Sequence, residues 1–232
     1  MATQSRTAVI AGSGSGLSAS LARLLSREGF TVALAARNVE KLSGLCAETG
    51  ARAYSCDVCD EGEVAALFDQ LDHDMGPPDV AIFNAGARAR GPIAELDVAD
   101  VARAVITSAM GGFHVGQQAA RRMLPRGHGA ILFTGASASV KGYAQSAPFA
   151  MGKFALRGLA QSMARELAPK GIHVAHFVID GQIRNPGRSE PADRPDSMLD
   201  PDAIAASYLH VLNQPKSAWT WEVELRPWVE TF

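Results

Sequence analysis

The chain has 232 residues, of which 47% are hydrophobic and 20% are charged, and its formal net charge is −2 at pH 7. This length is sufficient for one large α/β domain, and the composition argues against a disordered chain. A nearly balanced charge gives no general attraction to nucleic acid or to an anionic membrane. We therefore expect the partner to be a small molecule.

Residues 1–7 lack the apolar core of a secretory signal, and no segment approaches the roughly 18 apolar residues of a membrane span. The three cysteines are an odd number in a chain too large to need disulfides, which predicts a reducing, cytoplasmic environment. Cys56 and Cys59 have CxxC spacing. Without a second pair or a nearby His cluster, we interpret them as a strand end, and we expect no metal.

Short apolar runs alternate with segments of helical periodicity along the chain, as in a parallel sheet with crossover helices. Strands are predicted at 7–11, 30–36, 53–56, 79–83, 130–134, 173–179 and 219–225. Helices are predicted from 17 onward and near 38–48, 64–71, 98–123, 148–168 and 201–212. The pattern predicts a single α/β domain over 1–232 with a doubly wound sheet of about seven parallel strands and helices on both faces.

Residues 184–201 contain four prolines and several charged residues, and they show no clear periodicity. Too little chain follows for a second domain. Since α/β sheets bind ligands at the carboxyl ends of their strands, we interpret this segment as a mobile loop or lid over the ligand site.

A turn of alternating glycine and serine lies between the first predicted strand and the first predicted helix. Glycine lets the backbone approach a pyrophosphate closely, and the free amides and dipole of a helix N-terminus favour negative charge. This placement predicts a dinucleotide site of the Rossmann type. Its residues are Gly12, Ser13, Gly14, Ser15, Gly16 and Leu17.

Three motifs in order resemble the short-chain dehydrogenase/reductase family over essentially the whole chain. Gly12 and Gly16 match the first two family glycines, whereas Ser18 replaces the third. Asp57-Val58 after the third strand matches the family's adenine-side Asp, and Asn84-Ala85-Gly86 after the fourth strand matches its Asn-Ala-Gly motif. Gly181 and Ile183 match the loop that contacts nicotinamide in the family. The resemblance implies a nicotinamide cofactor and hydride transfer to or from a small carbonyl or alcohol compound.

The second strand ends in Ala35-Ala36-Arg37-Asn38, without a carboxylate to hold a ribose 2′-hydroxyl. A guanidinium can bind a 2′-phosphate through two hydrogen bonds, so Arg37 favours NADP(H) over NAD(H). The alternative is that Arg37 is a solvated residue at the start of the next helix.

Carbonyl-reducing members of the family use Asn, Ser, Tyr and Lys, and here the resemblance carries over Lys153 alone. The Tyr position holds Phe149, the Asn position holds Ser108, and Ser137 lies one step from the Ser position. In the family the lysine binds the nicotinamide ribose and lowers the pKa of the tyrosine. Tyr143 is the nearest phenol that could replace the missing proton donor, although packing or a pocket wall is the simpler interpretation.

Two hypotheses therefore stand: an NADP(H)-dependent oxidoreductase with a degenerate catalytic set, and a catalytically weak or inactive NADP(H)-binding sensor or scaffold. The resemblance also implies a homodimer or homotetramer, with Trp219, Trp221 and Trp228 as strand and subunit-contact residues. We expect His114, His173 and His176 to serve packing or solvent contact, since the sequence suggests no acidic partner for them.

Overall fold

A computed structural model describes residues 6–231 of the chain. Its centre is one seven-stranded sheet in the order β3-β2-β1-β4-β5-β6-β7, and every pair of neighbouring strands is parallel. The order runs outward in both directions from β1 and β4, which confirms the predicted doubly wound, Rossmann-type sheet. The strands are β1 Thr7–Ala11, β2 Thr31–Ala36, β3 Arg52–Ser55, β4 Val80–Phe83, β5 Gly129–Thr134, β6 Ile172–Ile179 and β7 Glu222–Leu225.

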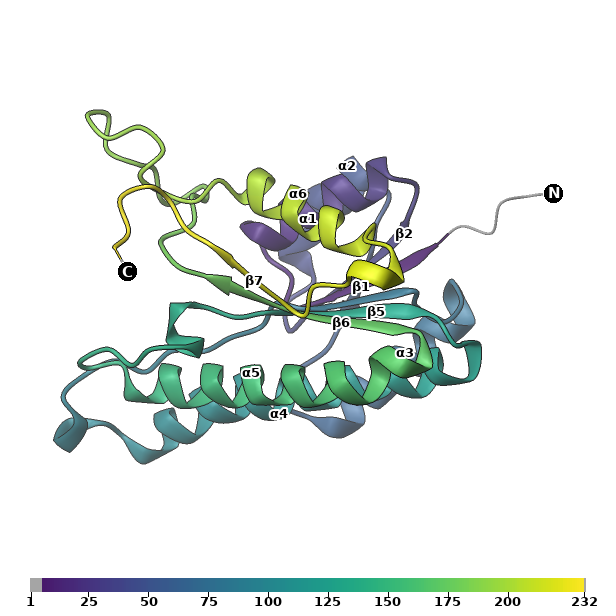
Figure 1. Cartoon of the computed structure of the whole chain (residues 1–232), viewed down its shortest axis with the longest axis horizontal. Helices are drawn as coiled ribbons and strands as arrows, with labels where there is room; N and C mark the ends of the chain where they lie inside the picture. Colours follow the sequence, from purple (N-terminus) through teal and green to yellow (C-terminus); the bar gives the residue numbers. More distant parts are fainter. Residues whose placement is uncertain (1–5, 232) are drawn as a thin grey trace.

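Helices cover both faces of the sheet, as Figure 1 shows. One layer contains α1 and α6, with α2 beside them, and the opposite layer contains α3, α4 and α5. The helices are α1 Leu17–Arg27, α2 Ser43–Thr49, α3 Glu61–Asp74, α4 Val98–Met123, α5 Ala147–Leu167 and α6 Pro201–Leu212. None of the described helices is long and apolar enough to cross a membrane.

The apolar strand runs are explained by burial on both faces. All residues of β1, β4 and β6 are buried. These strands are therefore apolar or small throughout rather than alternating, apart from His173 and His176 in β6. Phe83 and Phe133 pack with ring centroids 6.4 Å apart under the α3–α5 layer, while Phe177 stacks on Tyr208 of α6 on the other face at 3.6 Å.

The α4 and α5 helices approach each other closely because glycines lie along their contact. A Cβ on Gly152 of α5 would lie 2.9 Å from the Cβ of Ser108 on α4, and a Cβ on Gly116 would lie 3.1 Å from Met163. A Cβ on Gly112 would overlap Leu156. This close contact fixes where α5 places the side chains of its first turns.

The α1 helix begins differently from three of the other helices. Asp60, Asp97 and Asp200 cap α3, α4 and α6 by accepting hydrogen bonds from first-turn amides. At the start of α1, Gly16 offers no side-chain cap, and the first turn has no acidic residue. The Ala19 amide donates to the Gly16 carbonyl, so the Leu17 and Ser18 amides and the positive dipole end of the helix are available to an anion at the carboxyl edge of the sheet.

Two predicted elements differ from the structure. The segment predicted as a helix at 38–48 is a 3₁₀ turn, Glu40–Leu42, followed by α2. The last strand begins at Glu222 rather than at 219, because the side chain of Gln214 accepts a hydrogen bond from the Thr220 amide and donates one to its hydroxyl. That amide is thereby removed from strand pairing.

The predicted loop is observed from residue 184 to 200, since Pro201 is the first residue of α6. An isolated bridge joins Ile183 to Leu199 at its base, and Leu199 is buried. The loop projects from the upper left of the molecule in Figure 1, above the carboxyl ends of β6 and β7.

Candidate cofactor and substrate site

Two adjoining pockets lie at the carboxyl edge of the sheet, where the strand order reverses between β1 and β4. The Arg37 pocket is lined by Gly12, Ser13, Ala36, Arg37, Asn38, Lys41, Cys56, Asp57, Val58, Asn84, Ala85, Gly86, Ala87, Arg103 and Thr107. The Lys153 pocket is lined by Gly16, Leu17, Asn84, Ala85, Gly86, Arg88, Thr134, Gly135, Ala136, Phe149, Lys153, Ile179, Gly181, Gln182, Ile183, Arg184, Asn185 and Arg188. Residues 84–86 belong to both, so an elongated ligand can extend from one pocket into the other.

The glycine turn packs against Ala85, one of the residues that line both pockets. Gly12 has φ +91°, and a Cβ there would lie 2.6 Å from the Cα of Ala85, so only glycine fits this position. The amides of Gly12 and Ser13 both donate to the carbonyl of Ala35. A Cβ on Gly14 or Gly16 would meet no described atom within 4 Å, so the backbone of the turn is open to a ligand.

Ser18 ties this turn to the strand beside it. Its hydroxyl donates to the Gly12 carbonyl at 3.0 Å and accepts a hydrogen bond from the Asn84 side chain at 2.7 Å. The sequence indicated only that Ser18 replaces a family glycine. The structure shows that it bridges two motifs, an arrangement that no local pattern could reveal.

Three basic side chains line the Arg37 pocket from separate parts of the chain. Arg37 follows β2, Lys41 lies in the 3₁₀ turn after it, and Arg103 comes from α4. Asp57 is the one carboxylate among the lining residues, and its side chain accepts a hydrogen bond from the Cys59 amide. The excess of positive charge suits an anion. Lys41 could have been found from its spacing of one helical turn after Arg37, whereas Arg103 carried no sequence signal.

The Lys153 pocket contains a buried amine. Lys153 is 5% exposed, and its Nζ donates to the Thr134 carbonyl at 2.7 Å. Burial, reinforced by the charge of Arg88, lowers the pKa of Lys153 to about 8. Phe149 lies one helical turn earlier, with its ring centroid 5.9 Å from Nζ, and the Arg88 guanidinium lies 4.3 Å from the same ring.

Comparison with known proteins identifies this arrangement. Residues 6–184 match the sequence model of the family described as short chain dehydrogenase. The chain belongs to the short-chain dehydrogenase family. A crystal structure of a short-chain dehydrogenase from Rhodopseudomonas palustris is 41% identical, with a TM-score of 0.83, and the match covers 96% of this chain and 99% of that chain.

Two further relatives show the range of the family. A cis-4-hydroxycyclohexanecarboxylate dehydrogenase from Sinomonas cyclohexanicum is 34% identical over 73% of this chain and 70% of its own length. An actinorhodin polyketide ketoreductase, solved with NADPH, is 26% identical with a TM-score of 0.87, and 98% of each chain is covered. The chain is thus similar to nucleotide-binding oxidoreductases along nearly its whole length.

The residues that the sequence resemblance matches to the family's catalytic positions are dispersed in this structure. Phe149 and Lys153 line the Lys153 pocket, as do Gly181 and Ile183, whereas Ser108, Ser137 and Tyr143 do not. Ser108 is fully buried between α4 and α5, and its hydroxyl has no hydrogen-bond partner among the described residues. Ser137 begins a 3₁₀ turn and is half-buried.

Tyr143 belongs to a different local group from Lys153. It is 45% exposed, and its ring lies 5.7 Å from the Nζ of Lys141. The hydrogen bond to Tyr143, together with nearby Asp180, raises the pKa of Lys141. The phenol therefore has a neighbouring lysine, but this lysine is not the one that lines the pocket.

The expectation that His114, His173 and His176 have no acidic partner is wrong for His176. Its Nδ1 lies 3.1 Å from a carboxylate oxygen of Glu222, which also accepts two hydrogen bonds from Arg157. The partner was hidden because it is 46 residues away and meets His176 through the register of β6 and β7. Burial lowers the pKa of His176 to about 4, so the ring is neutral at pH 7.

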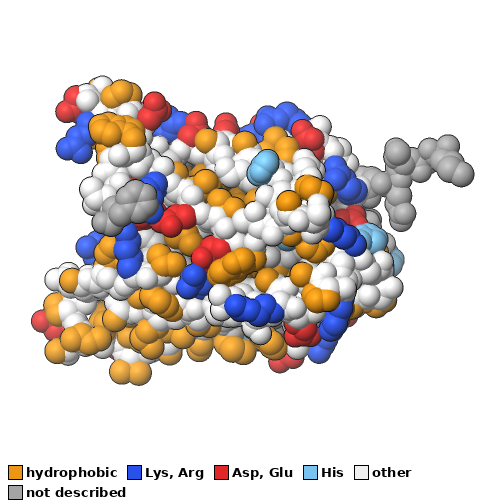
Figure 2. All heavy atoms as spheres, viewed as in Figure 1, with side chains coloured by type: hydrophobic (Ala, Val, Ile, Leu, Met, Phe, Trp, Pro, Cys, Tyr) orange, Lys and Arg blue, Asp and Glu red, His pale blue; other side chains and the backbone are white. Residues whose placement is uncertain are grey.

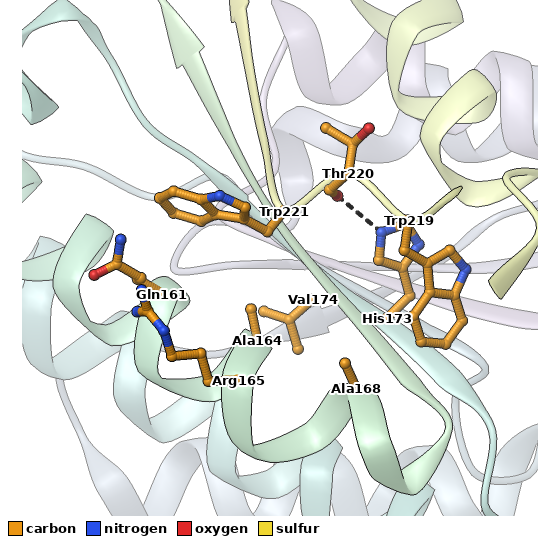
Figure 3. A pocket seen from close by; sticks show the side chains of 9 residues that line it. All are labelled: Gln161, Ala164, Arg165, Ala168, His173, Val174, Trp219, Thr220 and Trp221. Atoms are coloured by element: carbon orange, nitrogen blue, oxygen red, sulfur yellow. Dashed lines mark hydrogen bonds between the residues drawn. The ribbon is translucent and has the colours of Figure 1, made fainter. Parts of the chain in front are cut away.

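A separate hollow, shown in Figure 3, lies at the amino end of β6 and therefore away from both pockets. His173 stacks on Trp219 there at 4.6 Å, and its ring donates to the Thr220 carbonyl. Trp221 and Gln161 also line the hollow, on the side away from Trp219 in Figure 3. His173 and Trp219 therefore pack against each other. His114 is buried elsewhere, and its Nδ1 donates to the Val58 carbonyl.

Proposed function

We propose that the protein is an NADP(H)-dependent oxidoreductase that transfers hydride to or from a small carbonyl or alcohol compound. The observation that carries this proposal is the pair of joined pockets, with three basic residues at one end and Lys153 at the other. NADP(H) supplies or accepts the hydride when bound. The NADPH present in the related ketoreductase supports the same cofactor here.

Each part of the cofactor has matching residues in this proposal. The glycine turn and the uncapped start of α1 would hold the pyrophosphate through backbone amides. Asp57 and Val58 would contact the adenine, and residues 84–86 would line the passage between the pockets. Lys153 would bind the nicotinamide ribose, with Gly181 and Ile183 beside the nicotinamide.

The preference for the 2′-phosphate rests on charge. Arg37, Lys41 and Arg103 line the pocket that would receive the adenosine ribose, and β2 is not followed by a carboxylate. Charge-assisted hydrogen bonds of this kind are worth about 1.5–3 kcal/mol each. We therefore propose NADP(H) rather than NAD(H).

The chemistry in this proposal lacks the family's phenol, since Phe149 can neither donate nor accept a proton. Lys153 itself, with a pKa of about 8, is the titratable group at this end of the site. In the proposed reaction the proton passes through Lys153 or through a water that it orders. Hydride transfer then depends mainly on the proximity of the substrate to the cofactor.

A sensor or scaffold that binds NADP(H) without turnover is the second candidate. It is favoured by the positions of Ser108 and Ser137 outside the Lys153 pocket and by Phe149 at the Tyr position. Steady consumption of NADPH with any member of a carbonyl panel would exclude it.

We also propose that the chain assembles as a homodimer or homotetramer through α4 and α5. These helices expose apolar side chains along one surface, and Figure 2 shows them as a band at the lower edge of the molecule. The exposed residues include Ile106, Met110, Phe113, Met151 and Phe154. Such a contiguous surface is typical of a subunit interface. A monomer in sedimentation experiments would contradict this proposal.

The cofactor proposal is tested by thermal unfolding with NADP(H) or NAD(H). Ligand at about a hundredfold excess over Kd stabilises a native protein by about 2.7 kcal/mol. We expect NADPH to raise the Tm of the wild type strongly and Arg37→Ala to weaken NADPH binding about tenfold to a hundredfold. Arg27→Ala, an exposed residue at the end of α1, is the matched control. Equal shifts with NADH and NADPH would contradict the preference, and no shift would contradict the function.

A further inference from the structure

The Lys153 pocket carries more positive charge than binding a ribose requires. Arg88, Arg184 and Arg188 line it together with Lys153, and none of its lining residues is Asp or Glu. The three arginines come from the loop after β4 and from the loop before α6. An open pocket with several cations and no lining carboxylate favours an anionic ligand.

The guanidinium of Arg88 is positioned by Phe149. It lies 4.3 Å from the centroid of that ring, a cation–π contact that fixes its plane while leaving its N–H groups available. Partial burial lowers the pKa of Arg88, and the charges of Arg188 and Arg90 lower it further. Arg88 and Arg188 line the same pocket, so their like charges repel each other.

The two arginines of the projecting loop differ in their partners. Arg184 forms ion pairs with Glu190 and Asp200, so its charge is balanced within the loop and at the start of α6. Arg188 has no carboxylate partner among the described residues, and a turn with two backbone hydrogen bonds to Asn185 holds its position. The unbalanced charges of the pocket are therefore those of Arg88, Arg188 and Lys153.

The phosphates of the cofactor have other places in the proposed function. Its pyrophosphate would face the glycine turn and the start of α1, where Gly16 and Leu17 line the same pocket as the arginines, and its 2′-phosphate would face Arg37. Arg88 instead stacks on Phe149, the position at which the family presents its phenol to the substrate. An anion between Arg88 and Arg188 would consequently belong to the substrate.

We propose that the substrate carries a carboxylate or phosphate group, which Arg88 and Arg188 bind beside Phe149 and Lys153. This inference rests on the proposed function, because a bound cofactor makes this pocket the substrate side of the site. A planar guanidinium recognises either oxyanion through two parallel hydrogen bonds. The group would hold one end of the substrate and so direct its carbonyl or alcohol carbon toward the nicotinamide.

The test is calorimetric titration of the NADP⁺-saturated protein with matched ketones. One pair is 4-oxopentanoate and its methyl ester, and the other is dihydroxyacetone phosphate and dihydroxyacetone. The variants are Arg88→Gln and Arg188→Gln. Arg90→Gln is the matched control, since Arg90 is exposed on the same loop and does not line the pocket. Thermal unfolding of each variant establishes that it is folded.

We expect at least one anionic ketone to bind tenfold or more tightly than its neutral counterpart. Arg88→Gln and Arg188→Gln should each remove most of that preference, and Arg90→Gln should keep it. Preference within the first pair alone identifies a carboxylate, and preference within the second pair alone identifies a phosphate. The inference is overturned if neither anion is preferred, or if the preference survives in both pocket variants. Failure to bind NADP⁺ would instead overturn the proposed function itself.

Discussion

The Arg37 pocket and the Lys153 pocket retain family features to different extents. In the proposed function, the first holds the cofactor through basic side chains and through the backbone of the glycine turn, where the substitution of Ser18 for glycine is accommodated by two hydrogen bonds. In the proposed function, the chemistry of the second depends on single side-chain atoms, and Phe149 carries no hydroxyl there. A site built from backbone amides thus tolerates side-chain change, whereas a proton relay does not.

The most sensitive test of this comparison is Phe149→Tyr. A positioned general acid contributes about 10²- to 10⁴-fold in rate, and the new hydroxyl would lie one helical turn from Lys153. We expect single-turnover oxidation of NADPH, with a substrate that the wild type reduces, to accelerate by about 10²-fold or more. Phe154→Tyr, on the proposed subunit surface of the same helix and outside the pocket lining, should leave the rate unchanged. Equal rates for wild type and Phe149→Tyr would show that the missing phenol does not limit turnover.

The backbone half of the comparison is tested by two glycines of the same turn. Gly12→Ala places a methyl group against the backbone of Ala85 at a positive φ, and we expect a loss of about 3 kcal/mol in the free energy of unfolding. Gly14→Ala meets no described atom within 4 Å and should change stability by less than about 0.5 kcal/mol. Urea unfolding without ligand measures both. Similar losses in the two variants would contradict a backbone-determined turn.

The buried amine gives a smaller, pH-dependent effect. The pKa of Lys153 is about 8 in the folded protein and 10.5 for an ordinary lysine, so the unfolded chain binds more protons between these values. The titration of Lys153 should therefore raise the free energy of unfolding of the wild type as pH rises through this window. Lys153→Met has no amine to titrate and should not show this rise. Relative to wild type, the variant should lose on the order of 2 kcal/mol of stability between pH 7 and about pH 10.

Urea unfolding at each pH measures the free energy of unfolding of both proteins. The titration of groups that the two proteins share cancels in the difference between them. Lys170→Met, at an exposed position after α5, is the control and should show a constant difference from wild type. A constant difference for Lys153→Met as well would mean that the amine is not desolvated.

Local patterns predicted the sheet and the glycine turn because both depend on residues close in sequence. Apolar runs identified seven strands, and the position of Gly12 directly after a strand indicated its role. The convergence of Arg88 with Arg188 was not predictable, since it requires knowing how two loops from different strands lie at one edge. The contact of His176 with Glu222 depends likewise on strand register.

The glycine contact between α4 and α5 has a consequence for enzyme redesign. Phe149 and Lys153 are carried on α5, whose distance from α4 is set at Gly112, Gly116 and Gly152 by missing side chains. A larger residue at one of these points would shift the whole helix and carry both pocket residues with it. The depth of the pocket can thus be changed by substitutions on the α4–α5 contact, without replacing any lining residue.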